Sequence, residues 1–147
     1  MKRISFFLIL GLLMLAPVSV LAEYISVAVP VANIRSGPSE DSSLLWQVEA
    51  YYPMLVLEKS GSWYKFKDFE GDVGWIYASL VNHDESVITI KSDCNVRSGP
   101  GTNYDILFKT EVGIPFKVLK KKGKWLNVLH TDGDRGWIYK SLVWPNR

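Results

Sequence analysis

Cysteine and histidine are the residue types in this sequence that could carry nucleophilic chemistry. The chain has one cysteine, Cys94, and two histidines, His83 and His130. A cysteine nucleophile needs a base within hydrogen-bond reach and a third group that orients the base. No recognisable hydrolase sequence surrounds Cys94, and Ala32 stands at its equivalent position in the internal repeat described below. We therefore expect Cys94 to be a small buried side chain in a protein that is not an enzyme.

Two pairs of acidic residues could contribute oxygen ligands to a metal ion. Each pair flanks a glycine: Glu70 with Asp72, and Asp132 with Asp134. Calcium takes about six to eight oxygen ligands, and two carboxylates fall far short of that number. Asp side chains are also common in turns, where they accept hydrogen bonds from nearby backbone amides. The sequence therefore predicts ordinary turns at both places, with no metal and no cofactor.

Lysine is concentrated at one predicted hairpin tip, which contains Lys120, Lys121, Lys122 and Lys124. These ammonium groups could contact an anionic polymer or lipid headgroups. A solvated turn is the commoner role of such a short charge run, and it is the preferred interpretation. The whole chain carries 17 basic and 15 acidic residues, a balance that does not favour a nucleic-acid partner.

An internal repeat with an offset of 62 residues organises the chain. Several segments and single residues recur at this offset without a gap: GDVGWIYASLV at 71–81 as GDRGWIYKSLV at 133–143, RSGP at 35–38 as RSGP at 97–100, and Trp63 as Trp125. Solenoid units have periods of about 20–50 residues, so a longer gapless repeat indicates a duplicated domain. We expect one domain at residues 23–82 and a second at 87–147.

Short strands separated by turns containing glycine or proline account for most of each repeat. In the first repeat the expected strands cover residues 27–31, 33–35, 44–48, 54–59, 63–67 and 73–76, followed by a helical turn at 77–80. In the second repeat they cover 115–121, 125–129 and 135–138. Neither repeat has a long segment of helical periodicity, so we expect an all-β fold of small barrels or sandwiches.

Strand alternation places several tryptophans outside the predicted core. Tyr64 and Phe66 share the apolar face of their strand, so Trp63 points the other way with Lys65. The same count puts three further rings off the core: Trp75, Trp125 and Trp137. Apolar rings gathered on a surface usually mark a contact site, which is the preferred interpretation. Alternatively, these rings cover a barrel end or pack against the other repeat.

The ordered motifs of each repeat resemble the bacterial SH3-like (SH3b) domain. The order is Asn-(Ile/Val)-Arg-Ser-Gly-Pro, a proline before a strand, Gly-x-Trp, and Gly-Asp-x-Gly-Trp-Ile, over approximately residues 27–81 and 89–143. The resemblance implies two tandem small SH3-like β-barrels. Family members are usually exported modules that bind cell-wall or peptide ligands, often attached to peptidoglycan hydrolases.

The resemblance also implies the position of a binding groove. Gly-Ser-Trp-Tyr is similar to the Asp-Trp-Trp stretch of eukaryotic SH3 domains, whose first tryptophan lines the groove for proline-rich peptides. The implied ligand-binding residues are Trp63, Trp75, Tyr77, Trp125, Trp137 and Tyr139. Tyr77 and Tyr139 stand where the groove proline would be, and Leu80 and Leu142 where its tyrosine would be. A specificity for proline-rich peptides therefore does not follow.

The N-terminal segment predicts export. Lys2 and Arg3 precede an apolar run that reaches Leu15, and small residues near Ala22 suit cleavage after that residue. We expect a signal peptide at residues 1–22 and a periplasmic, cell-surface or extracellular mature protein. An uncleaved segment would instead anchor the chain, which is the only membrane contact that we expect.

These features, with the resemblance, predict an exported and non-catalytic binding module. Its expected partner is a cell-wall peptide or glycan, or an envelope protein, held in the aromatic grooves. The alternative is an envelope assembly protein whose aromatic faces are buried against a partner. Contact with an anionic polymer through the lysine run remains open as a second kind of site.

Overall fold

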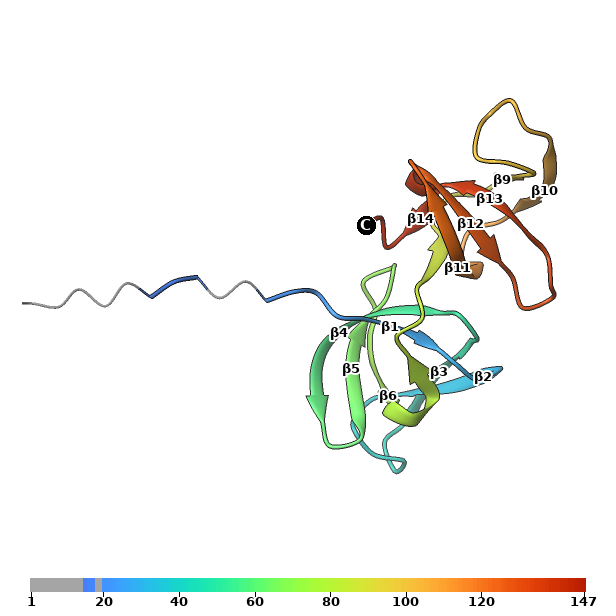
Figure 1. Cartoon of the computed structure of the whole chain (residues 1–147). Helices are drawn as coiled ribbons and strands as arrows, with labels where there is room; N and C mark the ends of the chain where they lie inside the picture. The colour runs from blue at the N-terminus through green and yellow to red at the C-terminus, as the bar shows by residue number, and fades with distance from the viewer. Residues whose placement is uncertain (1–14, 18–19) are drawn as a thin grey trace, which may run out of the picture.

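The computed structural model describes residues 15–17 and 20–147, and residues 24–144 form two successive β units (Figure 1). The predicted signal peptide, residues 1–22, lies largely outside the described residues. Residues 20–22 have no regular structure and lead into the first strand. In the part of the chain that the structure describes, no helix has the length and apolar character needed to cross a membrane.

Seven strands and one 3₁₀ turn make up the first unit. They are β1 (Tyr24–Val27), β2 (Val31–Arg35), β3 (Leu44–Glu49), β4 (Pro53–Ser60), β5 (Trp63–Lys67), β6 (Val73–Tyr77), η1 (Ala78–Leu80) and β7 (Val81–Asn82). Hydrogen bonds join the strands in the order β3-β2-β6-β5-β4-β1-β7, and every pair is antiparallel. Short hairpins are sufficient to connect antiparallel neighbours such as β4 and β5.

The second unit repeats this architecture. Its elements are β8 (Ser86–Thr89), β9 (Cys94–Arg97), β10 (Ile106–Thr110), β11 (Pro115–Lys122), β12 (Trp125–Leu129), β13 (Arg135–Tyr139), η2 (Lys140–Leu142) and β14 (Val143–Trp144). The strand order β10-β9-β13-β12-β11-β8-β14 is that of the first unit with each label raised by seven. The all-β fold class and the duplication predicted from the repeat are therefore confirmed.

The strand bounds agree with the sequence pattern in most places and differ in two. Residues 63–67 and 125–129 coincide with β5 and β12. The run at 27–31 predicts one strand, but β1 ends at Val27 and β2 begins at Val31. Pro30 lies in the corner between these strands and has no N–H to donate to a ladder. Ser86, which lies between the two expected domains, instead begins β8 and is buried.

Each unit has its own apolar core, and the two cores use equivalent positions. The buried core includes Ile25, Ile34, Met54, Phe66 and Ile76 in the first unit and their equivalents Val87, Val96, Phe116, Val128 and Ile138 in the second. The aromatic ring moves between neighbouring strands, since Met54 and Phe66 correspond to Phe116 and Val128. Because one large ring is kept in each core, the exchange leaves the total side-chain volume of the core about the same, and cores tolerate such changes.

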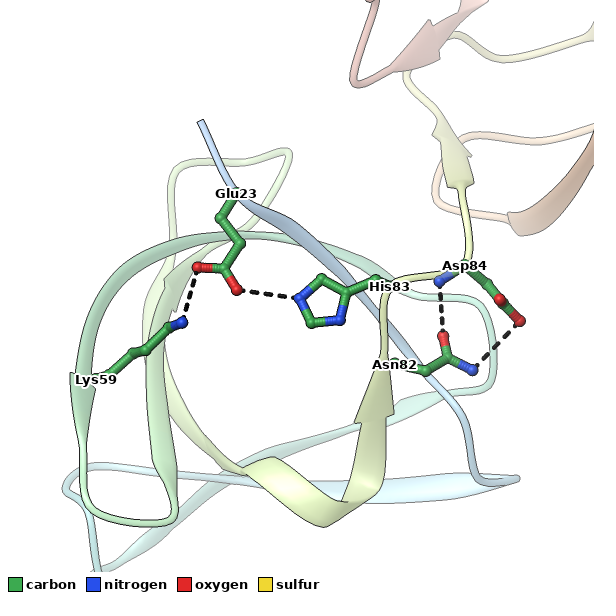
Figure 2. Close-up of polar contacts among 5 residues, drawn as sticks. All are labelled: Glu23, Lys59, Asn82, His83 and Asp84. Atoms are coloured by element: carbon green, nitrogen blue, oxygen red, sulfur yellow. Dashed lines mark hydrogen bonds and ion pairs between the residues drawn. The ribbon is translucent and has the colours of Figure 1, made fainter. Parts of the chain in front are cut away.

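Glu23, the first residue after the predicted cleavage site, is tied to the segment between the units (Figure 2). Its carboxylate lies 3.1 Å from the Lys59 ammonium and 3.0 Å from Nε2 of His83. The hydrogen bond with His83 is the main cause that lowers the pKa of Glu23. Beside it, the Asn82 side-chain oxygen accepts a hydrogen bond from the backbone amide of Asp84 at 3.0 Å. The connecting segment therefore has defined partners in the first unit.

Aromatic and ionic contacts join the connecting segment and the chain terminus to both units. The rings of Tyr24 and Trp144 meet edge to face with centroids 5.8 Å apart, and the Arg147 guanidinium lies 4.4 Å from the Tyr24 centroid. Glu85 of the connecting segment forms an ion pair with Lys121 on β11. The two units are thus in contact, as their close succession in the sequence suggested.

Asp68 organises the loop between β5 and β6 from a buried position. It is 3% exposed, and its Oδ1 accepts hydrogen bonds from the backbone amides of Glu70 and Asp72 at 3.0 and 2.9 Å. The hydroxyl of Tyr52 donates to Oδ2 at 2.8 Å. The second unit has Ile114 and His130 at the positions of Tyr52 and Asp68, so this arrangement is particular to the first unit.

Replacing Tyr52 with phenylalanine is expected to remove an alkaline loss of stability. Burial is the main cause that raises the pKa of Tyr52 above its ordinary value, followed by the Asp68 hydrogen bond. Because the pKa of Tyr52 is higher in the folded state than in the unfolded state, the protonated hydroxyl stabilises the fold. This stabilisation is complete below about pH 10 and is lost as the pH rises further. Denaturant titrations at about pH 9 and about pH 11 should show a steeper fall for wild type than for Tyr52→Phe.

The neighbouring tyrosine provides the control for that measurement. Among the hydrogen bonds of the described residues, none involves the side chain of Tyr51. Tyr51→Phe should therefore keep the pH dependence of wild type. Parallel pH dependences for wild type and Tyr52→Phe would show that the buried hydroxyl is not the group responsible.

Candidate functional site

Neighbouring strands bring a tryptophan and a tyrosine together on the outer face of each unit. Trp63 of β5 lies opposite Tyr77 of β6, with ring centroids 5.5 Å apart at 59°. Trp125 of β12 and Tyr139 of β13 repeat the pair at 5.3 Å and 63°. Rings inclined in this way attract through the negative face of one and the positive edge of the other. The residues that alternate with the tyrosines along β6 and β13 are buried, which confirms the predicted orientation.

An open pocket lies beside each ring pair. Five kinds of residue line both pockets at equivalent positions: Asn33, Arg35, Trp63, Tyr77 and Leu80 in the first, and Asn95, Arg97, Trp125, Tyr139 and Leu142 in the second. The volumes are about 740 Å³ in the first unit and about 630 Å³ in the second. Both fall within the range of roughly 300–1,000 Å³ that is common for small-ligand sites. The duplication has therefore preserved a whole pocket, not only a pair of rings.

The arginine of each pocket braces the loop that forms the pocket wall. Arg35 Nη1 donates to the carbonyl of Ser42 at 3.1 Å. Arg97 Nη1 donates to the carbonyls of Thr102 and Tyr104 at 3.1 and 3.0 Å. Each guanidinium thus holds the loop that follows β2 or β9, and it lines the pocket as well. These bonds give each arginine a structural role in its loop.

The asparagines differ in their partners. Asn33 Oδ1 accepts a hydrogen bond from Gln47 Nε2 at 2.7 Å. Lys109 stands at the position of Gln47 in the second unit, and its ammonium pairs with Asp93 at 3.5 Å instead. Oδ1 of Asn95 is buried and has no hydrogen-bond partner among the described residues. The floor of the second pocket therefore contains a polar atom whose equivalent in the first pocket is satisfied.

Trp75 and Trp137 share the outer face but line neither pocket. Trp75 lies opposite Lys65 in the ladder, and Trp137 lies opposite Asn127. The Lys120 ammonium sits 5.6 Å from the Trp137 ring centroid, a distance at which a cation is attracted to the ring face. The structure thus brings together four of the six predicted aromatic residues as two pairs. A binding role for Trp75 and Trp137 stays a prediction.

The lysine run occupies the hairpin between β11 and β12, as its composition predicted. Gly123 has a φ of +57° at the tip, a conformation that favours glycine. Lys122 lies opposite Trp125 in the ladder, and the amide of Lys140 donates to the carbonyl of Lys124 at 2.9 Å. These bonds place the backbone of all three lysines beside the ring pair of the second pocket.

Cys94 is 2% exposed, as expected for a packing residue, and its thiol donates to the carbonyl of Lys91 at 3.1 Å. Burial raises the pKa of this thiol, which reduces the thiolate population that a nucleophile requires. The two histidines contact carboxylates elsewhere, His83 at Glu23 and His130 at Asp132. The described residues therefore do not assemble the Cys–His pair considered from the sequence.

The acidic pairs take part in turns. Asp132 Oδ1 accepts the amide of Asp134 at 2.8 Å, and this hydrogen bond is the main cause that lowers the pKa of Asp132. In the first unit the amides of Glu70 and Asp72 both bond to Asp68, so these two side chains are not needed to form the turn. The expected turn chemistry is present, but in the first unit Asp68 supplies it.

Several pocket residues were not predicted as binding residues from the sequence. Asn33 and Asn95 come from β2 and β9, which lie far in sequence from the pocket tryptophans, whereas Leu80 and Leu142 come from η1 and η2, which directly follow the pocket tyrosines. A signal was available, because Asn33 and Arg35 alternate with buried Ile34 and the Asn-x-Arg pattern recurs in the second repeat. The loop residues of the pocket walls have no such repeated pattern.

The fold and the paired pockets define a class of small antiparallel β modules. A family model described as "Bacterial SH3 domain" matches residues 28–83 and again residues 91–145. The chain belongs to this family, and the predicted tandem SH3-like architecture is confirmed. The two units are its first and second domains.

Two curated relatives are similar in sequence, and both carry provisional names. YrvJ of Bacillus subtilis strain 168, named an N-acetylmuramoyl-L-alanine amidase, is 25% identical over 80% of this chain and 24% of its own length. LytH of Staphylococcus epidermidis, named a cell wall amidase, is 34% identical over 43% of this chain and 22% of its own length. The chain thus spans about a quarter or less of the length of these relatives.

Among solved structures, an NlpC/P60 family protein from Bacillus cereus is similar. The alignment covers 82% of this chain and 55% of the chain of that protein. The TM-score is 0.40 and the sequence identity is 15%. A superposition at this level carries no functional weight.

Proposed function

We propose that this protein is an exported, non-catalytic module that binds a peptide or glycan of the bacterial cell wall through its two aromatic pockets. The observation that carries the proposal is the recurrence of one set of pocket residues, Trp, Tyr, Leu, Asn and Arg, in both domains. Tryptophan and tyrosine offer flat apolar faces to a sugar or peptide, and the asparagine and arginine add polar contacts.

The relatives and the N-terminal sequence support the setting of this function. Both relatives are named for amidase activity on the cell wall or its N-acetylmuramoyl-L-alanine bond, and the matched region is the SH3-like part of each alignment. A module of this kind would hold its protein at the wall, while catalysis belongs to other parts of a hydrolase. The signal peptide proposed at residues 1–22 would deliver the chain to that compartment.

Removal of the pocket tryptophans is expected to abolish retention on the wall. Trp63→Ala with Trp125→Ala deletes one wall of each pocket, and loss of such an aromatic anchor lowers affinity by about tenfold or more. Co-sedimentation with purified Bacillus subtilis sacculi measures the retained fraction. Circular dichroism of each variant establishes that the fold is kept.

The outer-face tryptophans supply a matched control for that experiment. Trp75→Ala with Trp137→Ala also removes two tryptophan side chains, but these lie on β6 and β13 outside the pockets. We expect this variant to be retained like wild type. Equal retention of a folded Trp63/Trp125 variant would refute the pocket assignment, and selective loss in the Trp75/Trp137 variant would move the site from the pockets to Trp75 and Trp137.

A second candidate, an envelope assembly protein, is favoured by one feature of the sheet edges. β3 and β10 are edge strands, and each begins with two exposed apolar residues: Leu44 and Leu45, and Ile106 and Leu107. Exposed apolar edge strands are templates for pairing with another chain.

Iodide quenching separates the two functions, because open pockets predict accessible tryptophans in the isolated protein. Size-exclusion chromatography would show whether Leu45→Lys with Leu107→Lys dissolves an assembly.

A further inference from the structure

The two pockets have the same floor but carry different charges around it. Six pairs of equivalent residues in the pocket wall or beside the ring pair differ in charge: Val31 and Asp93, Glu40 and Thr102, Asp41 and Asn103, Ser60 and Lys122, Ser62 and Lys124, and Ala78 and Lys140. The arginine is common to both pockets. The duplication has therefore kept the apolar contact while changing the electrostatics.

The first pocket is acidic. Arg35 is its one cation among these positions, against the carboxylates of Glu40 and Asp41, which gives a formal charge of −1. The Arg35 guanidinium is already bonded to the Ser42 carbonyl. An anionic ligand would therefore meet two exposed carboxylates at the wall of this pocket.

The second pocket is basic. Arg97 and the three lysines at 122, 124 and 140 outweigh Asp93, and the formal charge over the same positions is +3. Asp93 is itself paired with Lys109 at 3.5 Å, which removes much of its effect. A site of this charge attracts anions from solution and disfavours cations.

Lys122, Lys124 and Lys140 have no anionic partner within the described part of the chain. Lys120 lies over the Trp137 ring and Lys121 pairs with Glu85, so they are engaged elsewhere. The ion pairs of the described residues include none with Lys122, Lys124 or Lys140. Like charges held together without a counter-ion repel one another, and a bound anion would relieve that repulsion.

The position of these lysines relative to the rings is fixed by the sheet. Lys122, Trp125 and Tyr139 form one row across β11, β12 and β13, and side chains in such a row share a face. Lys124 and Lys140 flank the two rings in sequence and are joined by the hydrogen bond between their backbones. In the first domain the same row is Ser60, Trp63 and Tyr77.

We propose that the second pocket binds a wall peptide segment with a free carboxylate, whose apolar part lies on Trp125 and Tyr139 and whose charge lies among Lys122, Lys124 and Lys140. The first pocket, with its carboxylates, does not select for an anion. This inference rests on the proposed wall-binding function and names the ligand chemistry of one of its two sites. A peptide carboxylate suits that function, since the relative YrvJ is named for the bond between a muramoyl sugar and an amino acid.

The first domain supplies the substitutions that test the proposal. Lys122→Ser, Lys124→Ser and Lys140→Ala give the second domain the residues of the first at these positions, which the same fold already accommodates. A control variant removes three positive charges outside both pockets: Lys65→Asn, Lys67→Ser and Arg135→Val. Both variants carry the same net charge, so a difference between them reports position and not overall charge.

Binding to Bacillus subtilis sacculi is measured at low and high salt. We expect the pocket variant to bind about five- to tenfold more weakly than wild type in about 0.05 M salt. The difference should largely vanish in about 1 M salt, where the Debye length is about 3 Å. The control variant should bind like wild type at both salt concentrations. Equal binding by the two variants would overturn the proposal.

Chemically altered sacculi identify the source of the anion. Amidation of the wall carboxylates should reduce wild-type binding to the level of the pocket variant, whereas hydrofluoric acid, which strips phosphodiester polymers, should leave it unchanged. Loss of binding after hydrofluoric acid alone would overturn the carboxylate assignment in favour of a phosphate polymer. If the lysine variant binds normally while Trp63→Ala with Trp125→Ala does not, the inference fails and the proposed function stands. If wild type does not bind sacculi, both fail.

Discussion

Gly136→Ala is expected to destabilise the second domain by about 1–3 kcal/mol, the usual cost of overfilling a packed site. A Cβ at this position would lie 2.7 Å from Cγ1 of Val96 and 2.8 Å from the carbonyl oxygen of Arg97. The first contact is with a fully buried side chain, and the second is with backbone, which cannot rotate away. Relief would require β9 and β13 to separate.

The sign of this effect is itself informative. Strand propensity alone predicts that alanine stabilises a strand relative to glycine by about 0.5–1 kcal/mol. Only the close approach of β9 to β13 predicts a loss. Denaturant unfolding of the full chain, followed by tryptophan fluorescence and circular dichroism, gives the free energy of unfolding for each variant. A stabilised Gly136→Ala variant would contradict the close packing of these strands.

Gly74→Ala is the matched change in the first domain. Its Cβ would clash with Cγ2 of Ile34 and contact the rings of Trp46 and Phe66. Ile34 is fully buried and its Cγ2 is attached directly to Cβ, so this methyl group has little room to shift. We therefore expect a loss similar to that for Gly136→Ala. The effect in the second domain also concerns function, because β9 carries Arg97 and β13 carries Tyr139, both of which line the second pocket.

The sequence was sufficient to predict the repeat, the class of fold and the faces of the tryptophans. Alternation along 63–67 and 125–129 worked because these strands are regular and have one face on the core. The same reasoning failed at 27–31, because an uninterrupted apolar run does not reveal the corner at Pro30. It also failed at Ser86, where a polar residue is buried within a strand.

The membership of the pockets was harder to predict than the position of their rings. Trp63 and Tyr77 meet because β5 and β6 are paired, but Asn33 and Arg35 reach the same pocket through the contact of β2 with β6. That contact joins residues about 40 positions apart, and local pattern does not encode it. Val73 and Arg135 differ in charge within the nearly identical segments 71–81 and 133–143, yet neither residue lines a pocket. The walls differ instead at Glu40/Thr102 and Asp41/Asn103.

Asp68→Ala should be the most damaging single change in a loop of the first domain, with a loss of about 3–5 kcal/mol. The carboxylate accepts three hydrogen bonds, from the Tyr52 hydroxyl and the amides of Glu70 and Asp72. Removing the carboxylate breaks these three part-buried hydrogen bonds at once, and hydrogen bonds to a charged acceptor are worth about 1.5–3 kcal/mol each. Because the loop joins β5 to β6, the pair Trp63–Tyr77 should lose its fixed geometry as well.

Two further variants separate the hydrogen bonds from the loop sequence. Asp68→Asn keeps one oxygen for the two amides but loses the charge and the second carboxylate oxygen, so an intermediate loss is expected. Asp132→Ala removes the corresponding turn bond of the second domain, where the carboxylate is exposed and accepts one backbone amide, and it should change stability little. Denaturant unfolding ranks the three variants. The second domain has no buried carboxylate in its corresponding loop. Equal losses of stability for Asp68→Ala and Asp132→Ala would therefore contradict a special role for the buried Asp68 carboxylate.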